Sequence, residues 1–295
     1  MDASAPLPEE IQAIPLGTDG LLGWKIATPL CRALISQQGA QVLEFQALGR
    51  KPLLWLSEQA GYRPGKAIRG GIPLCFPWFG PHPQDAGKPA HGFARLRDWR
   101  LVHTEKPGET LLLHFRLGAD EQTRRLWPHD FEARLSIALG RFLQLQLEVE
   151  NTGTTAFAFT FAFHSYFPVN DIRAAHVDGL DGTPRIDQLD PQRRRHTQQG
   201  PLRFAGETDQ IHLHAGGEYR LVDAAGGQAL RISAPACRSV IVWNPGQAKA
   251  ARLADMAPGA WRHMVCVECG NVEADLVALP PGSARRFSLL LEYGG

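Results

Sequence analysis

The sequence lacks a long apolar run, a leader-like N-terminus and an excess of charge of either sign. No apolar run approaches the roughly 18–20 residues that span a bilayer, and the first residues, MDASAPLPEEIQ, lack the basic and apolar regions of a signal peptide. Its 31 Lys and Arg and 30 Asp and Glu give a net charge of +1. This balance argues against a general nucleic-acid or anionic-membrane binder, so we expect neither partner.

Cysteine is also sparse, with five residues in a chain of 295. An odd, low count is typical of free thiols in a reducing compartment, so we expect a cytoplasmic protein. Cys266 and Cys269 form a C-x-x-C pair, but Cys31, Cys75 and Cys237 supply no second pair at zinc spacing. The pair also opens no helix in a βαβ context, as a redox motif would. We interpret both as thiols of a core strand.

What is present is the pattern of a β protein. Hydrophobic residues make up 44% and charged residues 21%, as in an ordinary globular domain. The strand patterns lie at residues 33–36, 40–47, 52–56, 110–118, 133–139, 142–151, 156–167, 176–180, 212–214, 219–222, 229–233, 239–243, 264–269 and 285–293. Only residues 119–127, opened by Asp120, resemble a helix. We therefore predict an all-β antiparallel sandwich with one or two short helices, organised as a lead-in (1–20) and a single domain (21–295).

The stretch AFAFTFAFHSYF at residues 156–167 alternates strictly. Four phenylalanines point to one side, and the other side carries Ala158, Thr160, Ala162 and His164. Small residues that leave room beside a titratable group are typical of a pocket floor. The alternative is that His164 is a strand-end histidine satisfied by a neighbour.

A carboxylate interrupts an otherwise apolar strand at MVCVECGN, where Glu268 shares a face with Met264 and Cys266. Burying a carboxylate costs free energy unless it is paired or hydrogen-bonded. Glu268 is therefore either the partner of a core arginine or a general base whose pKa is raised by burial.

Residues 57–100 form a long irregular segment rich in Gly and Pro, which contains Arg69, His91 and Arg95. Such segments inside a compact domain are usually functional, and arginine suits phosphate or carboxylate. Pairing with structural acids is the alternative for both arginines. His212 and His214 have the H-x-H spacing of some metal sites, but without a carboxylate and a third histidine nearby an exposed or structural pair is favoured.

Several motifs together resemble one family. They are IRGGIPLCFPWFG (68–80), AHGFARLRDW (90–99), TRRLWPHDF (123–131), FHSYFPVNDI (163–172), TDQIHL (208–213), WNPG (243–246) and MVCVECGNV (264–272). In this order they resemble the aldose 1-epimerase (galactose mutarotase-like) superfamily, and more narrowly its hexose-6-phosphate mutarotase, or glucose-6-phosphate 1-epimerase, branch. The resemblance implies a large twisted antiparallel β-sandwich with an open cleft over one sheet.

The resemblance also implies roles for individual residues. His164 would be the general acid and Glu268 the general base that open and close the sugar ring. His91 would be a second histidine at the sugar, and Asp209 would hold sugar hydroxyls. The small residues of the 156–167 stretch would let the sugar lie on the sheet.

The resemblance further implies that Arg69 and Arg95 bind the phosphate of a phosphorylated hexose. Lys88 is a weaker candidate. Arg97 could share or replace the role of Arg95, because this chain has Leu96-Arg97-Asp98 before Trp99, where many relatives carry Asn and Pro. No metal or organic cofactor is implied, and we expect a monomer. Three alternatives stay open: a mutarotase for free galactose or glucose, a non-catalytic carbohydrate-binding sandwich, and a metal enzyme that uses His212 and His214.

Overall fold

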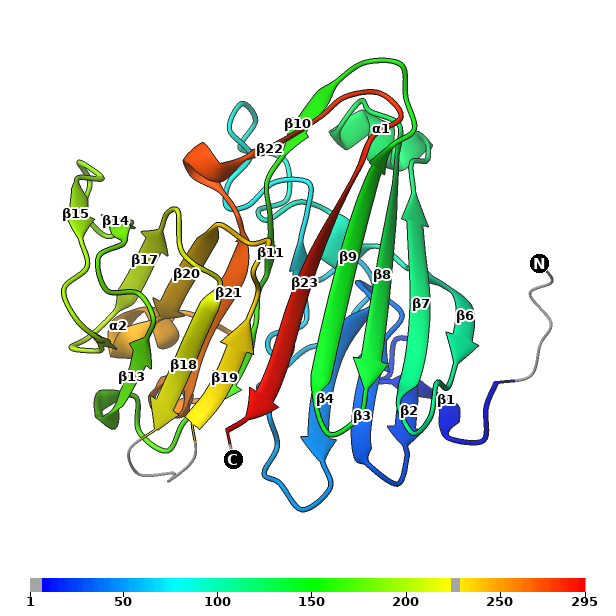
Figure 1. Cartoon of the computed structure of the whole chain (residues 1–295), viewed down its shortest axis with the longest axis horizontal. Coiled ribbons are helices and arrows are strands. Elements are labelled where there is room, and N and C mark those ends of the chain that lie inside the picture. Colours follow the sequence, from blue (N-terminus) through cyan, green and yellow to red (C-terminus); the bar gives the residue numbers. More distant parts are fainter. Residues whose placement is uncertain (1–6, 224–228, 295) are drawn as a thin grey trace.

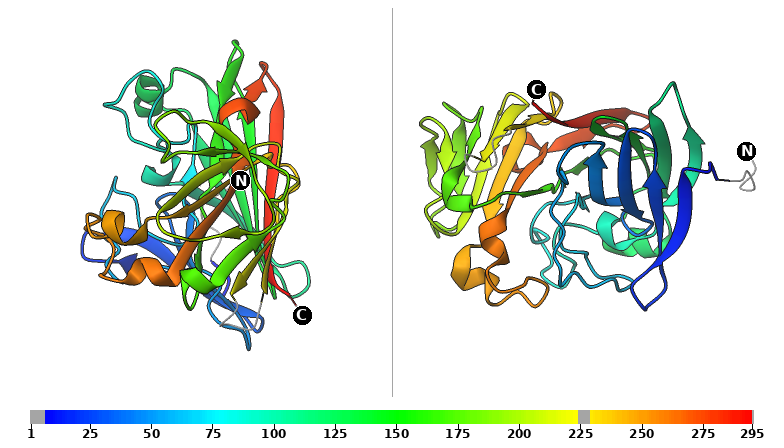
Figure 2. Two further views of the ribbon diagram at one scale, coloured as in Figure 1. Left: turned by 90° about the vertical axis from the view of Figure 1, so that its left-hand side faces the viewer. Right: turned by 90° about the horizontal axis from the view of Figure 1, so that it is seen from below.

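The computed structural model describes residues 7–223 and 229–294, which fold into antiparallel sheets with few and short helices (Figure 1). A nine-stranded sheet runs across the molecule, and a four-stranded and an eight-stranded sheet lie behind its two halves (Figures 1 and 2). The predicted all-β sandwich is confirmed.

The nine-stranded sheet has the order β16-β13-β18-β19-β23-β9-β8-β7-β6. Its strands are β6 (Arg100–Glu105), β7 (Leu111–Gly118), β8 (Phe131–Leu139), β9 (Leu143–Asn151), β13 (Ala175–Asp178), β16 (Leu202–Arg203), β18 (Glu218–Asp223), β19 (Ala229–Ser233) and β23 (Ala284–Tyr293). In β9 fully buried positions alternate with partly exposed ones, so one face of the sheet covers the core and the other meets solvent.

The eight-stranded sheet has the order β15-β14-β17-β20-β21-β11-β5, and β12 also pairs with β21. Its strands are β5 (Leu74–Cys75), β11 (Phe161–Phe163), β12 (Tyr166–Pro168), β14 (Pro184–Asp187), β15 (Arg195–Thr197), β17 (Thr208–His212), β20 (Ser239–Asn244) and β21 (Met264–Asn271). Strand β21 lies inside this sheet and all eight of its residues are buried. Polar side chains on β21 therefore have little access to water.

The four-stranded sheet contains β1 (Ile11–Leu16), β2 (Leu21–Ala27), β3 (Cys31–Ser36) and β4 (Gln41–Ala47) in chain order. Strand β1 lies inside the stretch that we predicted as a lead-in, and it pairs with β2 from Ile11↔Ile26 to Leu16↔Leu21. The sequence analysis missed this strand, while the division into a lead-in and one domain stays a prediction.

Two short α-helices are present in the described part of the chain, α1 (Glu121–Leu126) and α2 (Gly246–Ala250). Helix α1 confirms the prediction for residues 119–127, because the Asp120 carboxylate accepts the Thr123 N–H and the Thr123 hydroxyl accepts the Asp120 N–H. Single 3₁₀ turns are η1 (Ala94–Leu96), η2 (Ile172–Ala174), η3 (Ala260–His263) and η4 (Glu273–Asp275). Among the residues described, none of the helices combines the length and the apolar character needed to cross a membrane.

The four phenylalanines at 157–163 are core, as predicted, but the stretch 156–167 forms β10 (Phe157–Phe159), β11 and the start of β12 rather than one strand. Phe157, Phe159, Phe161 and Phe163 are all buried. The ladder breaks at Thr160, whose N–H donates to Pro77 O and whose hydroxyl accepts the Phe79 N–H. Strand β10 therefore pairs with β22 (Val277–Leu279), whereas β11 joins β21 and β5.

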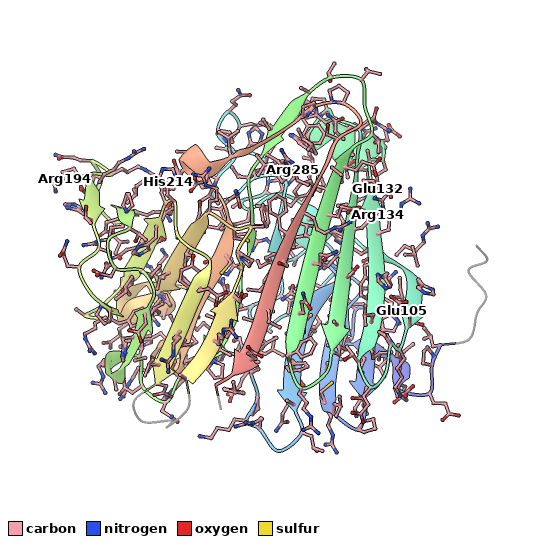
Figure 3. All side chains as sticks on the ribbon, viewed as in Figure 1. Glu105, Glu132, Arg134, Arg194, His214 and Arg285 are labelled. Atoms are coloured by element: carbon pink, nitrogen blue, oxygen red, sulfur yellow. The ribbon has the colours of Figure 1, made fainter. Side chains whose placement is uncertain are left out.

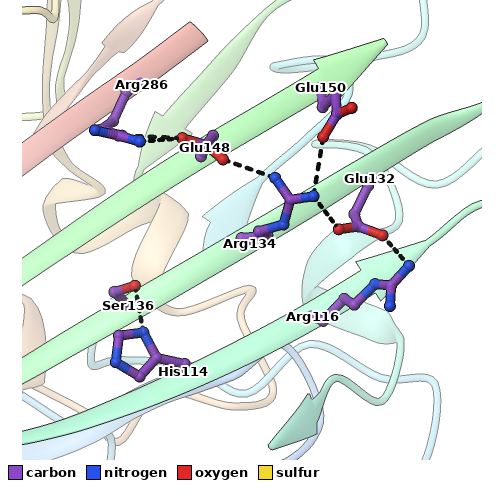
Figure 4. A network of polar contacts seen from close by, with 8 residues as sticks. All are labelled: His114, Arg116, Glu132, Arg134, Ser136, Glu148, Glu150 and Arg286. Atoms are coloured by element: carbon purple, nitrogen blue, oxygen red, sulfur yellow. Dashed lines mark hydrogen bonds and ion pairs between the residues drawn. The ribbon is translucent and has the colours of Figure 1, made fainter. Parts of the chain in front are cut away.

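Charged side chains cover the solvent face of the nine-stranded sheet (Figure 3). At its centre Arg134 contacts Glu148 at 2.7 Å, Glu150 at 2.9 Å and Glu132 at 2.5 Å (Figure 4). Arg286 and Arg116 extend this group to further strands. We call this set of six residues the outer-face network.

Candidate active site

A cleft of about 380 Å³ opens over the eight-stranded sheet. Its volume falls within the range of about 300–1,000 Å³ that is usual for small-molecule sites. The cleft is lined by the six predicted site residues Arg69, His91, Arg95, His164, Asp209 and Glu268. The structure therefore brings together side chains from four separate parts of the chain, while their roles stay predictions.

His164 and Glu268 meet at the floor of this cleft. His164 Nδ1 lies 3.4 Å from Glu268 Oε1, and the side chains are 8% and 2% exposed. Glu268 is fixed by β21, where it lies opposite Ile241 of β20. His164 follows β11, donates its backbone N–H to Pro73 O, and stacks its ring on Tyr166 with 4.8 Å between centroids. Strand β21 and the short connection between β11 and β12 thus hold a carboxyl group and an imidazole in contact.

Burial decides where the proton of this pair lies. Desolvation, followed by the charge of Asp209, raises the pKa of Glu268 well above its usual value. Desolvation is the main cause that lowers the pKa of His164 well below its usual value, and the nearby guanidinium charges of Arg95 and Arg69 add to it. Burial therefore favours the uncharged form of both groups, with a proton on the Glu268 carboxyl rather than on the His164 ring.

Neither member of the pair is satisfied by the rest of the protein. In the described part of the chain, Glu268 Oε2 and His164 Nδ1 are buried and have no hydrogen-bond partner. No ion pair joins Glu268 to a described arginine, so a structural pairing with a core arginine does not explain this buried carboxylate. Groups left unpaired in this way are free to bind a substrate.

His91 stands beside the pair as a neutral donor. Its Nδ1 accepts the backbone N–H of Gly80 at 3.3 Å, so the ring proton lies on Nε2. Desolvation, with the charges of Arg95 and Arg69, lowers its pKa to about 3. The turn that presents it has positive φ at His91 (63°) and at Gly92 (72°). A Cβ at Gly92 would lie 2.1 Å from Phe76 O, so only glycine fits there.

Arg69 is held by groups that its sequence context did not indicate. Its Nε donates to Asp255 Oδ2 at 3.1 Å, its Nη1 donates to Tyr166 Oη at 3.2 Å, and its guanidinium lies 5.9 Å from the Trp243 ring centroid. Asp255 and Trp243 also line the cleft. No signal in the sequence pointed to Asp255, because its role depends on tertiary proximity to Arg69. Trp243 belongs to the WNPG motif, but the sequence analysis assigned it no role.

Of the three candidates to accompany Arg69, only Arg95 lines the cleft. Its Nη2 donates to Ala90 O at 3.0 Å, and its buried Nε has no partner within the described residues. Arg97 instead binds Asp120 and Gln122, and Lys88 donates to Leu126 O at 2.8 Å. Arg97 and Lys88 are therefore not among the residues that line the cleft, and the assignment of Arg69 and Arg95 to a phosphate stays a prediction.

Asp209 forms a polar wall of the cleft. It accepts a hydrogen bond from Gln188 Nε2 at 2.6 Å, and Lys249 Nζ lies 3.9 Å away. Burial raises the pKa of Asp209, although Gln188 and Lys249 oppose this shift. Lys249 is carried by α2 and also lies 5.9 Å from the Trp243 ring centroid. The sequence analysis missed both Gln188 and Lys249.

The small residues of the phenylalanine stretch were expected to lie on the floor of the cleft. The small residues of the phenylalanine stretch do not line this cleft: Ala158 and Thr160 line a separate hollow, and Ala162 is buried in apolar packing. The expectation that a sugar lies on them is wrong, because the break at Thr160 separates β10 from β11.

His212 and His214 each contact a different part of the protein. His212 is buried, and its Nδ1 lies 2.8 Å from the Thr183 hydroxyl. His214 follows the end of β17, and its Nδ1 lies 2.9 Å from Asp275 Oδ1. The two imidazoles thus have separate protein partners rather than a shared ligand position.

Comparisons with known proteins agree with these motifs. The family model described as Aldose 1-epimerase matches residues 24–292. A protein of Escherichia coli named "Putative glucose-6-phosphate 1-epimerase" is 34% identical over 240 residues, covering 81% of this chain and 80% of its own length. One of Cenchrus ciliaris with the same name is 34% identical over 270 residues, covering 88% and 81%. The crystal structure of a "putative mutarotase" from Salmonella typhimurium superimposes with a TM-score of 0.87 at 30% identity, covering 96% of this chain and 97% of that one.

Proposed function

Because the chain belongs to the aldose 1-epimerase family, we propose that it interconverts the α and β anomers of a hexose 6-phosphate, with glucose 6-phosphate as the expected substrate. The observation that carries the proposal is the contact between His164 and Glu268, at 3.4 Å, on the floor of a cleft that also holds Arg69 and Arg95. The names of the relatives support the phosphorylated substrate.

Anomers interconvert when the hemiacetal ring opens, the C1–C2 bond rotates and the ring closes again. Opening removes a proton from the C1 hydroxyl and adds one to the ring oxygen. Glu268 takes the first proton and His164 gives the second, and the two exchange roles when the ring closes. Each positioned proton transfer contributes about 10²–10⁴ in rate.

The pair carries the one proton that this cycle needs. In the free cleft that proton lies on Glu268, for the desolvation reasons given above. Its transfer from Oε1 to Nδ1 gives protonated His164 and ionised Glu268 with no exchange with solvent, once the 3.4 Å contact shortens on binding. A bound phosphate favours this transfer, because it neutralises Arg69 and Arg95, whose charges lower the pKa of His164.

The remaining lining residues stabilise and orient the sugar. His91, neutral and with its proton on Nε2, donates to the ring oxygen as that oxygen gains negative charge. Asp209 and Lys249 offer an acceptor and a donor to hydroxyls. The phosphate binds Arg69 and Arg95, and this anchoring fixes the ring against the acid–base pair.

The test is an NMR exchange assay on α-glucose 6-phosphate with purified enzyme, and with α-glucose in parallel. We expect exchange between anomers well above the spontaneous rate, and faster at equal concentration for the phosphorylated sugar. Exchange at the spontaneous rate despite bound sugar would identify a non-catalytic carbohydrate-binding protein. Equal rates for the two sugars would identify a mutarotase for free aldoses.

A further inference from the structure

One cysteine lies against the acid–base pair and takes no part in the proposed chemistry. His164, Cys266 and Glu268 each bring one ligand atom, a nitrogen, a sulfur and an oxygen, to within 4.8 Å of one another. All three side chains are buried. Thiolate sulfur, imidazole nitrogen and carboxylate oxygen are the donor types that bind zinc in proteins, and here the sulfur lies directly beneath the cleft that His164 and Glu268 line.

The sheet fixes the three donors from neighbouring strands. Cys266 and Glu268 are two residues apart in β21 and so project from the same face. Cys266 lies opposite Tyr166 of β12 on one side and Trp243 of β20 on the other. His164 stacks on Tyr166, which brings its ring over the same strand. The donors are therefore held by the backbone rather than by mobile loops.

Two of these side chains have coordination capacity that the protein does not use. Among the described residues, His164 Nδ1 and Glu268 Oε2 are buried without a hydrogen-bond partner. A buried polar group without a partner costs free energy, which a ligand or ion that binds it recovers. Arg69 and Arg95 make the electrostatic potential of the cleft more positive. A divalent cation can bind there only if Cys266 and Glu268 are ionised, because their negative charges then offset this repulsion.

We propose that a soft divalent cation, Zn²⁺, binds His164, Cys266 and Glu268 and thereby switches the enzyme off. On binding, the Cys266 thiol and the Glu268 carboxyl each release one proton to solvent, and His164 binds as neutral imidazole. Zinc bonds of about 2.0–2.3 Å require modest side-chain rotations to draw the donors together. The metal then occupies both the proton acceptor and the proton donor, so neither can serve the sugar.

The binding experiment compares two cysteines of the same strand. Cys266→Ala removes the sulfur donor, and Cys269→Ala is its matched control because Cys269 lies on the opposite face, in the main core. Zinc titration calorimetry on reduced, metal-free protein should give one site in the wild type and in Cys269→Ala. In Cys266→Ala the affinity should fall at least ~100-fold, since even groups outside the ligand shell contribute 10–100-fold.

Cobalt supplies a spectroscopic readout that does not depend on activity. Co²⁺ bound to the wild type and to Cys269→Ala should show thiolate-to-cobalt charge-transfer absorption, and Cys266→Ala should not. A third variant, Cys75→Ala, tests the other thiol near the cleft, whose Sγ lies 3.5 Å from His91 Nδ1. Absorption or zinc affinity that depends on Cys75 instead of Cys266 would overturn the assignment, as would the absence of zinc binding by the wild type.

The inhibition experiment rests on the proposed function, whereas the calorimetry and the cobalt spectra do not. Zinc should abolish anomer exchange by the wild type, a chelator should restore it, and Cys266→Ala should retain its activity in zinc. Equal zinc inhibition of Cys266→Ala and wild type would refute the proposal. If the wild type has no anomerase activity at all, the proposed function fails, while the calorimetry and cobalt spectra still decide the metal site.

Discussion

The outer-face network and the cleft both contain ionisable side chains that lie against antiparallel sheets, yet the surroundings of these side chains are opposite in kind. Arg134 has three carboxylate partners and remains 45% exposed to water. In the cleft Glu268 Oε2 and Arg95 Nε are buried and, within the part of the chain that is described, have no partner. Charges that are paired and hydrated contribute to solubility and a little to stability, whereas unpaired buried ones are poised for a ligand.

The contrast also applies to protonation. Arg134 and Arg286 lower the pKa of Glu148 in the network, chiefly by hydrogen bonds to its carboxylate, so this group stays ionised. Desolvation instead raises the pKa of Glu268 well above its usual value. The same residue type therefore works as a fixed anion on one surface and as a proton carrier on the other. Five predictions test this contrast.

The largest effect is expected from removing the carboxylate of the cleft. Glu268→Gln should retain the fold and lower kcat for anomer exchange by about 10²–10⁴, because one positioned proton transfer is lost. NMR exchange spectroscopy measures it. The matched control is Glu148→Gln in the outer-face network, which should leave kcat unchanged. Full activity in Glu268→Gln would refute its assignment as the base.

The next effect concerns the two arginines of the cleft. Arg69→Ala or Arg95→Ala should raise KM for glucose 6-phosphate by about 10–100-fold, since a hydrogen bond to a charged group contributes about 1.5–3 kcal/mol. The KM for free glucose should change far less. Arg97→Ala and Lys88→Ala serve as controls, because their partners lie outside the cleft. A similar change for both sugars would contradict phosphate binding.

The pH profile of kcat/KM tests the single proton of the pair. At low pH, activity should fall only when the His164–Glu268 pair takes up a second proton, which binds to His164. Because the pKa of His164 is lowered, this decline in activity should lie well below pH 6.5. At high pH the pair loses its proton only above the raised pKa of Glu268. We expect a broad plateau around neutral pH, with about tenfold loss per pH unit on either limb. An acidic limb centred at the ordinary histidine value would argue against the buried pair.

Glu268 should also lower stability as the pH rises. Its folded pKa is raised, so the folded state binds more protons than the unfolded state above pH 4.5, the usual value. Relative to Glu268→Gln, the wild type should lose about 1.4 kcal/mol per pH unit across the window below the raised pKa. Urea unfolding of both proteins at several pH values measures this. A constant difference with pH would show that Glu268 titrates normally in the folded state.

The smallest effect belongs to the outer-face network. Arg134→Gln should lower the free energy of unfolding by about 1 kcal/mol or less, because exposed ion pairs contribute little. The loss should shrink further in high salt, where such pairs are screened. Chemical denaturation with and without added salt checks both points. A loss of several kcal/mol would remove the distinction drawn here between the two regions.

The elements of the fold that could be predicted from the sequence are those that depend on local patterns of residues. The alternation of β9 and the Asp120 cap of α1 are both present in the structure as expected. Strand β1 was missed because IQAIPL contains a proline and its burial pattern follows no strict alternation. The break at Thr160 was also missed, since it depends on hydrogen bonds to the distant residues Pro77 and Phe79.

The candidate site could likewise be predicted only in part. Its six residues came from motifs of the family, and all six line one cleft. Their supporting contacts could not be predicted, because Asp255, Gln188 and Lys249 act through tertiary neighbours such as Arg69 and Asp209. The protonation of the pair likewise depends on burial, which only the assembled sheets reveal.

Strand β21 has one more consequence, from its burial along its whole length and its pairing with β20, β11 and β12. Backbone amides in such a position exchange with deuterium mainly when the whole protein unfolds. Glu268 is thus held by a fully buried strand, while His91 and Arg95 lie outside the strands, in the segment that precedes β6. On gentle heating the loops that hold the phosphate should loosen first, so substrate affinity should decline before turnover does.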